Sequence, residues 1–169
     1  AAQIMAVIKA DAYGHGVEYS AREMSEAGVD WFAVSNLEEA IQVRRAGLDK
    51  PVLILGYTPP EYAQQLALNG ISQAVFDVRY AHQLSACAEQ AGLQVRIHIK
   101  VDTGMTRIGF PYRDNVEDAG SVDEIEEACA LPGLYPEGIF THLSCADEEG
   151  EAEVYTRLQY DLFLDMIDR

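Results

Sequence analysis

Two lysines stand where an amine could do covalent chemistry. The chain has three lysines, Lys9, Lys50 and Lys100. Lys9 directly follows the apolar run QIMAVI, which is typical of a buried strand. A desolvated amine at the end of such a strand is the kind of group that forms a Schiff base with a carbonyl. The alternative is a structural lysine whose ammonium group extends into solvent. Lys50 precedes an expected strand and is interpreted as surface charge.

A second polar cluster lies in the segment HIKVDTGMTRIG. Lys100 and Asp102 alternate with apolar residues along an expected strand, and the following Thr103-Gly104 predicts a tight turn that leads to Arg107. One interpretation is an internal set of salt bridges among Lys100, Asp102 and Arg107. The other is that Arg107 presents its planar fork of N–H donors to an anionic oxygen of a ligand.

His142 and Tyr13 are single candidates, each with a plain structural alternative. His142 lies in THLSCAD at the end of another expected strand, although a lone histidine is more often a satisfied core or rim residue than a catalyst. Tyr13 follows Lys9 by four residues, so its hydroxyl could reach a phosphate, or its ring could only pack. Ser144-Cys145 lacks the flanking glycines of a nucleophile elbow. No metal site is predicted, because the four histidines show no metal-ligand spacing: His15, His82, His98 and His142.

The composition excludes several classes of partner. The formal net charge is −16, from 12 Lys+Arg and 28 Asp+Glu, and the sequence pI is about 4.4. Such a chain repels nucleic-acid phosphates and anionic membrane surfaces. Neither a run of about 18 apolar residues nor a signal peptide is recognised, so a cytoplasmic location without membrane contact is expected. The three cysteines show no CxxC spacing and are expected to be free thiols.

The positions of these residues depend on a regular alternation of strands and helices. Short apolar runs closed by Gly or Pro alternate with segments that repeat apolar residues at helical spacing. Such alternation predicts a parallel sheet covered by helices. Strands are expected at residues 3–8, 31–34, 51–55, 74–76, 94–101 and 137–143, and helices at 17–27, 37–46, 59–69, 78–91, 123–130 and 151–169.

Two α/β architectures compete, a doubly wound open sheet and a (β/α)8 barrel. The GHG at residues 14–16 lacks the third glycine of a dinucleotide-binding fingerprint and indicates a turn. An open sheet covered on both faces would bury the polar row of the fifth strand, whereas a barrel turns that row toward a solvated mouth. We therefore predict an α/β fold of (β/α)8 TIM-barrel type with about six of the eight βα units. The polar row comprises Arg96, His98, Lys100 and Asp102.

Three segments carry a family resemblance. AVIKADAYGHG resembles the pyridoxal-phosphate lysine motif of bacterial alanine racemases, and HIKVDTGMTRIGF and IFTHLSCADE resemble two further motifs of that family in the same order. VLILGYTPPE also fits. The resemblance covers essentially the whole chain. It implies an isomerase that interconverts L-alanine and D-alanine for peptidoglycan synthesis, with an N-terminal (β/α)8 barrel and a β-rich C-terminal domain in a homodimer.

The resemblance also implies roles on the cofactor. Lys9 would hold pyridoxal phosphate covalently and would act as base or acid on one face of the substrate Cα. Tyr13 would bond the cofactor phosphate, and Leu55 would lie along the cofactor pocket.

Three further residues gain roles in the same way. Arg107 would contact the phenolic oxygen of the cofactor, and His142 would sit behind its pyridine ring. Lys100 matches a lysine that is carbamylated in some members, where the new anion braces the arginine. Carbamylation needs a neutral amine, so a lowered pKa of Lys100 is expected.

Other readings stay open at this point. Serine/alanine racemases of glycopeptide resistance share these motifs, and a single-domain pyridoxal-phosphate carrier or regulatory protein, or a plain structural domain, would also use such a fold. Residues 1–169 are expected to be an incomplete N-terminal domain without the C-terminal domain, whose tyrosine supplies the opposing base from the partner subunit. The chain alone is therefore expected to have little racemase activity. Unpaired edges are expected on the first and sixth strands, inviting self-association.

Overall fold

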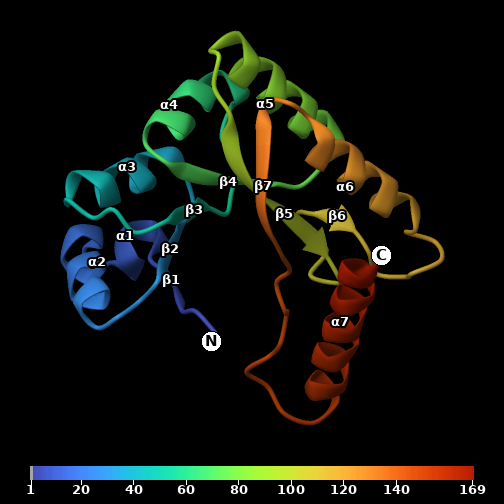
Figure 1. Cartoon of the computed structure of the whole chain (residues 1–169). Helices are drawn as coiled ribbons and strands as arrows, with labels where there is room; N and C mark the ends of the chain where they lie inside the picture. Colours follow the sequence, from blue (N-terminus) through green and yellow to red (C-terminus); the bar gives the residue numbers. More distant parts are fainter. Residues whose placement is uncertain (1) are drawn as a thin grey trace.

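The computed structural model describes residues 2–169, in which parallel strands alternate with helices (Figure 1). Each expected strand and helix is present, with bounds shifted by a few residues. The strands are β1 (Met5–Val7), β2 (Trp31–Val34), β3 (Val52–Ile54), β4 (Ile71–Val75), β5 (Val95–Asp102), β6 (Phe110–Pro111) and β7 (Leu134–Phe140). The helices are α1 (Lys9–Tyr13), α2 (Val17–Glu26), α3 (Leu37–Arg45), η1 (Pro60–Tyr62), α4 (Ala63–Leu68), α5 (Val78–Gln90), α6 (Gly120–Ala130) and α7 (Glu151–Asp168).

The strands form one parallel sheet in the order β1-β2-β3-β4-β5, with β7 paired along β5 and β6 paired to the end of β5. Figure 1 shows α2 to α6 in an arc around the outside of this sheet, with α7 apart from the arc. Among residues 2–169, β1 pairs only with β2 and β7 only with β5, so both have the unpaired edge expected of them. The partial α/β barrel is confirmed, whereas self-association at these edges stays a prediction.

The two-residue repeat of β5 separates the core from the mouth. One row of β5 side chains packs with the helices in the main core: Val95, Ile97, Ile99 and Val101. The other row lies on the opposite, inner face of the sheet. Arg96 in this row is exposed, but His98, Lys100 and Asp102 are buried, more than a solvated mouth would predict. Neighbouring strands cover them.

Side chains of the adjacent strands β4 and β7 satisfy part of this inner row. The carboxylate of Glu137 accepts a hydrogen bond from the Ser72 hydroxyl at 2.6 Å and lies 3.4 Å from Nε2 of His98 and 3.5 Å from Arg96. Trp31 lies edge-on to the His98 ring, with centroids 5.3 Å apart. Burial lowers the pKa of His98, and the negative charge of Glu137 partly opposes that shift.

Strand β1 differs from the expected buried strand at residues 3–8. It is only three residues long, and Met5 and Val7 are exposed, because no strand among the described residues pairs with its free edge. The ladder continues one residue further, where the N–H of Ile8 donates to the carbonyl of Ala33 at 2.8 Å, and Ile8 is buried. Lys9 follows two residues beyond the end of β1, as the first residue of α1.

Helix α7 departs in part from the apolar stripe that its helical spacing predicts, Val154, Leu158, Leu162 and Met166. Val154 is 72% exposed and Leu158 is exposed as well, whereas Met166 is buried and Leu162 packs against the core. Gln159 is also buried, and its amide bonds to the backbone of the loop after β7.

Arg44 joins two loops at the N-terminal end of the sheet, opposite the mouth. Its guanidinium group donates to the carbonyls of Leu48 and Lys50 before β3, and to those of Asn69 and Gly70 before β4, at 2.8 to 3.1 Å. Four backbone acceptors are thereby satisfied by one planar donor group. Arg44 therefore fixes the entry of the chain into two central strands.

We expect Arg44→Lys to lower the free energy of unfolding by about 2 kcal/mol, because an ammonium group cannot reproduce the fork of donors. The exposed neighbour Arg45 offers a matched control, and Arg45→Lys should change stability by less than about 0.5 kcal/mol. Urea denaturation followed by circular dichroism measures both. Equal effects of the two substitutions would contradict the role of Arg44.

Candidate active site

A cavity of about 320 Å³ opens where β1, β2 and β3 end. It is lined by Lys9, Ser35, Leu55, Gly56, Arg107 and Ile108. Lys9 follows β1, Ser35 follows β2, and Leu55 follows β3, whereas Arg107 comes from the loop after β5. The carboxyl ends of parallel strands meet at one rim, which explains how residues distant in the sequence share one cavity. The structure thus brings together three predicted residues, Lys9, Leu55 and Arg107.

A left-handed turn sets the direction of Lys9. The four residues after it, 10–13, have φ between 52° and 55°, and Gly14 ends the turn in the same left-handed region. For residues with a Cβ this conformation costs roughly 1–2 kcal/mol each. Hydrogen bonds hold it: the N–H of Ala12 donates to the carbonyl of Ile8, and the Asp11 carboxylate accepts from the N–H of Val17 at 2.7 Å. Between the expected strand at 3–8 and the expected helix at 17–27, the sequence predicts only a loop.

Tyr13 is the one predicted cofactor residue near Lys9 that does not line the cavity. It is the last residue of the left-handed turn and is 62% exposed. Its hydroxyl group is therefore accessible to solvent.

Lys100 is buried on the inner face of β5, where its Nζ donates to the carbonyl of Val101 at 2.7 Å and lies 5.6 Å from the centroid of the Phe140 ring. Burial lowers the pKa of Lys100 to about 8; the negative charge of Asp102 opposes this shift, and the positive charge of Arg107 adds to it. The expected lowering of this pKa is thus present.

Asp102 shapes the loop that carries Arg107. Its Oδ1 accepts from the N–H groups of Gly104 at 3.1 Å and Thr106 at 2.9 Å. In the part of the chain that the structure describes, no salt bridge joins Lys100, Asp102 and Arg107, so that interpretation of the segment is wrong. Asp102 is engaged with backbone donors, which leaves Arg107 at the cavity for a ligand.

His142 lies at the rim, two residues beyond the end of β7. Partial desolvation lowers its pKa, and the positive charges of Arg107, Lys100 and Lys9 lower it further. The charges of Arg107, Lys100 and Lys9 therefore all act on His142 at the mouth. His142 does not line the cavity itself.

Helix α7 forms hydrogen bonds to the loops after β5 and β7 through two residues that were not predicted from the sequence, Gln159 and Tyr155. Gln159 is fully buried; its Oε1 accepts from the N–H and hydroxyl of Ser144, each at 2.9 Å, and its Nε2 donates to the carbonyl of His142 at 3.3 Å. The hydroxyl of Tyr155 donates to the carbonyl of Gly104 at 2.9 Å. Gly104 has a φ of +134°, which L side chains rarely adopt, and a Cβ there would also displace that hydroxyl. The sequence signal that could have identified Gln159 is a glutamine among the apolar residues of a predicted helix.

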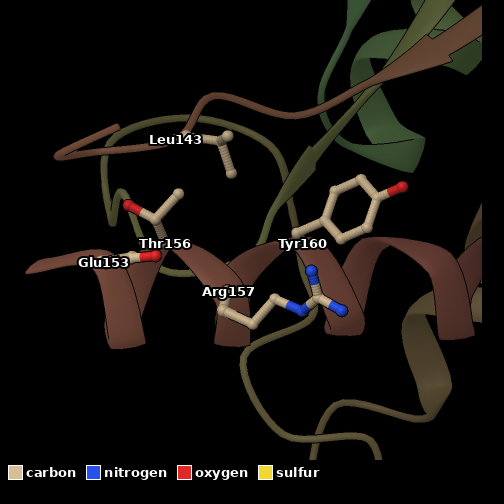
Figure 2. Close-up of a pocket in the computed structure, with 5 residues that line it drawn as sticks. All are labelled: Leu143, Glu153, Thr156, Arg157 and Tyr160. Carbon is tan, nitrogen blue, oxygen red and sulfur yellow. The ribbon is translucent and has the colours of Figure 1, made fainter. Parts of the chain in front are cut away.

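A larger cavity of about 530 Å³ lies beside α7 and is separate from this site. Figure 2 shows Leu143 above the helix and Thr156, Arg157 and Tyr160 along it, with Glu153 at one end. The Arg157 guanidinium lies 5.8 Å from the centroid of the Tyr160 ring. None of the predicted site residues lines this groove, and it is not the candidate active site.

Comparison with known proteins places the chain in a family. The model of the alanine racemase N-terminal domain matches residues 1–169. The chain is 41% identical over 167 residues to alanine racemase 2 of Caldanaerobacter subterraneus subsp. tengcongensis, which covers 99% of this chain and 41% of that protein. It therefore spans about two fifths of the length of the relatives that it matches.

Solved structures of racemases are also similar to this chain. The alanine racemase of Clostridium difficile 630 in complex with cycloserine has a TM-score of 0.89 and 38% identity, and the match covers 98% of this chain and 44% of that one. A histidine racemase from Leuconostoc mesenteroides subsp. sake has a TM-score of 0.84 and 32% identity, covering 95% of this chain and 41% of that one. Across residues 2–169, no helix is long and apolar enough to cross a membrane. With its matching domain, its fold and the lysine and arginine of its cavity, the chain belongs to the alanine racemase family.

Proposed function

We propose that this chain is the cofactor-binding part of a pyridoxal-phosphate-dependent amino-acid racemase that interconverts L-alanine and D-alanine. The observation that carries the proposal is the single cavity at the carboxyl ends of the strands, lined by both Lys9 and Arg107. A primary amine and a guanidinium group in one cavity suit a carbonyl compound that also carries anionic oxygens.

The charges around the cavity support a fit to pyridoxal phosphate. The positive charges of Lys9, Lys100 and Arg107 all lower the pKa of His142, so basic groups gather at the mouth. The one nearby carboxylate in that loop, Asp102, is occupied by backbone N–H groups. An anionic phosphate and a phenolic oxygen would be stabilised in such surroundings. The formal charge of the whole chain is −16, so this local excess is specific to the mouth.

The residues of the chain would divide the work as follows. When bound, the cofactor supplies the electron sink that stabilises negative charge at the substrate Cα. The Lys9 amine would take the Cα proton on one face of the substrate, or return it. Arg107 would donate to the phenolic oxygen, His142 would stand behind the ring, and the exposed hydroxyl of Tyr13 would bond the phosphate. Leu55 would give the pocket an apolar wall that excludes water.

Racemisation needs a second proton-transfer group on the opposite face of the Cα. The cavity residues supply one amine, Lys9. We propose that the opposite group is the tyrosine of a C-terminal domain, contributed by the partner subunit of a homodimer. The complete natural protein that contains residues 1–169 is therefore the form to assay, and we propose that it acts in the cytoplasm in peptidoglycan synthesis.

A second substrate class has a specific observation in its favour. The solved structure of a histidine racemase shares this fold with a TM-score of 0.84. The fold of this part of the chain therefore does not by itself select the amino-acid side chain. Alanine remains the proposed substrate. Racemase assays of the complete protein with alanine, serine and histidine distinguish it from the two alternatives.

The complete protein reduced with borohydride in the presence of pyridoxal phosphate should carry a pyridoxyl label on Lys9, because its amine lines the cavity. Lys9→Ala should lose the label and racemase activity, at least 10³-fold, as expected for a covalently acting group. Peptide mass mapping and a coupled assay with D-alanine measure the two effects. Lys50→Arg, at the other end of the sheet, serves as control. A label on Lys50 alone would refute the proposal.

Arg107→Gln should raise the pKa values of His142 and Lys100, since the positive charge of Arg107 lowers both. His142 would then be protonated up to a higher pH than in the wild type. Nuclear magnetic resonance titration of the His142 ring measures this shift. Arg22→Gln removes the same charge from an exposed site on α2 and should leave His142 unchanged. An unchanged pKa of His142 in Arg107→Gln would show that the two groups do not interact.

We also propose that Lys100 is carbamylated. Its Nζ would attack carbon dioxide, form an N–C bond and release a proton, which requires the neutral amine; a pKa of about 8 makes that form accessible near neutral pH. The new carboxylate would brace Arg107. In ¹³C-bicarbonate, the wild type should give a carbamate carbon signal that Lys100→Gln lacks. A signal that persists in Lys100→Gln would place the modification elsewhere.

A further inference from the structure

The strained turn after Lys9 is tied to a neighbouring helix by a single carboxylate. Residues 10–13 are all left-handed, and the backbone N–H of Ala10 is the first donor after Lys9. It donates to Oε1 of Glu39 at 2.7 Å. Glu39 lies in the first turn of α3, and so in a different βα unit from Lys9. The bond therefore links the position of the Lys9 backbone to α3.

The other oxygen of the same carboxylate binds the second loop of the cavity. Oε2 of Glu39 accepts from the N–H and from the hydroxyl of Ser35, each at 2.8 Å. Ser35 lines the cavity together with Lys9. One half-buried side chain thus holds the loops after β1 and β2 at a fixed separation on the cavity wall.

A helix cap explains only part of this arrangement. Asn36 is the N-cap of α3, and its Oδ1 accepts from the N–H of Glu39 at 3.0 Å. In a capping box the carboxylate of Glu39 would return a bond to the N–H of Asn36, but its Oε2 instead accepts from Ser35, the residue before the cap. Nor does the cap account for the bond from Oε1 to Ala10, which lies 29 residues away in the sequence.

An ion pair does not explain it either. Within residues 2–169, Glu39 takes part in no salt bridge. Both of its oxygens act as acceptors of N–H or O–H groups. A glutamine of the same shape has only one acceptor oxygen, so its NH₂ group would face the N–H of either Ala10 or Ser35.

We propose that Glu39 is a positioning residue for Lys9: its carboxylate holds the left-handed turn closed and so aims the Lys9 amine into the cavity. The expected effect of Glu39 on the reaction rate rests on the proposed function, whereas its expected effect on the conformation of residues 10–13 does not. Catalysis by an amine depends on its orientation, and a displacement of about 1 Å costs on the order of 10²-fold in rate.

The test compares three variants of the complete protein. They are Glu39→Gln; Asn36→Ala, which removes the cap and the 3.4 Å bond from the Asn36 amide to the Ser35 hydroxyl; and Glu38→Gln, which removes the same charge from an exposed neighbour. In Glu39→Gln we expect kcat to fall by about 10- to 100-fold, with the KM for alanine changed by less than about threefold. Asn36→Ala should lower Tm without this fall in kcat, and Glu38→Gln should change neither.

Amide hydrogen exchange of residues 10–16 provides a readout that does not depend on activity. Exchange at Ala10 should be about tenfold faster in Glu39→Gln than in the wild type, and unchanged in Asn36→Ala. Unchanged exchange in Glu39→Gln, or an equal fall in kcat in Asn36→Ala, would overturn the proposal. A wild-type protein without racemase activity and without a label on Lys9 would instead refute the proposed function, while exchange would still decide whether Glu39 holds the turn.

Discussion

The two-residue repeat of β5 is the constraint on which the mouth depends. Because Val95, Ile97, Ile99 and Val101 face the helices, the residues that alternate with them must lie on the inner face of the sheet. Lys100 is thereby buried, and burial lowers its pKa to about 8. A shift of this strand by one residue would exchange the two rows and destroy both the core and the site.

Burial of that polar row in turn requires partners from the neighbouring strands and loops. Lys100 donates to a backbone carbonyl, Asp102 accepts from the loop of Arg107, and His98 lies beside Glu137. None of these groups forms an ion pair with Arg107. Basic groups therefore gather at the rim, where Arg107, Lys100 and Lys9 all lower the pKa of His142, although the chain as a whole is strongly acidic.

What the sequence could predict follows from local pattern. Apolar runs and helical spacing located every strand of the main sheet, and the strand-end positions of Lys9 and Arg107 fit their place in one cavity. Leu55, which lines the same cavity, was expected there only from the family resemblance. The left-handed turn after Lys9 was not predictable, because alanine and tyrosine disfavour this conformation and aspartate adopts it only as single residues. Its stabilising bonds come partly from Glu39, which is distant in the sequence. The apolar run at residues 3–8 predicted a buried strand, but burial of Met5 and Val7 depends on what packs against β1, which an apolar run does not specify.

The missed residues share a physical feature: each is a polar side chain on a helix that bonds to a loop of the mouth. Glu39 of α3 holds the loops after β1 and β2, and Gln159 of α7 holds the loop after β7. Tyr155 of α7 holds the loop of Arg107. The helical spacing of such residues does not distinguish them from solvated positions, and only the structure shows their bonds to the loops. Glu39 joins the loops after β1 and β2, while Gln159 and Tyr155 attach the loops after β7 and β5 to α7, so helices that contribute no group to the cavity position the loops around it. Substitutions on α3 and α7 should therefore alter the site without touching a ligand.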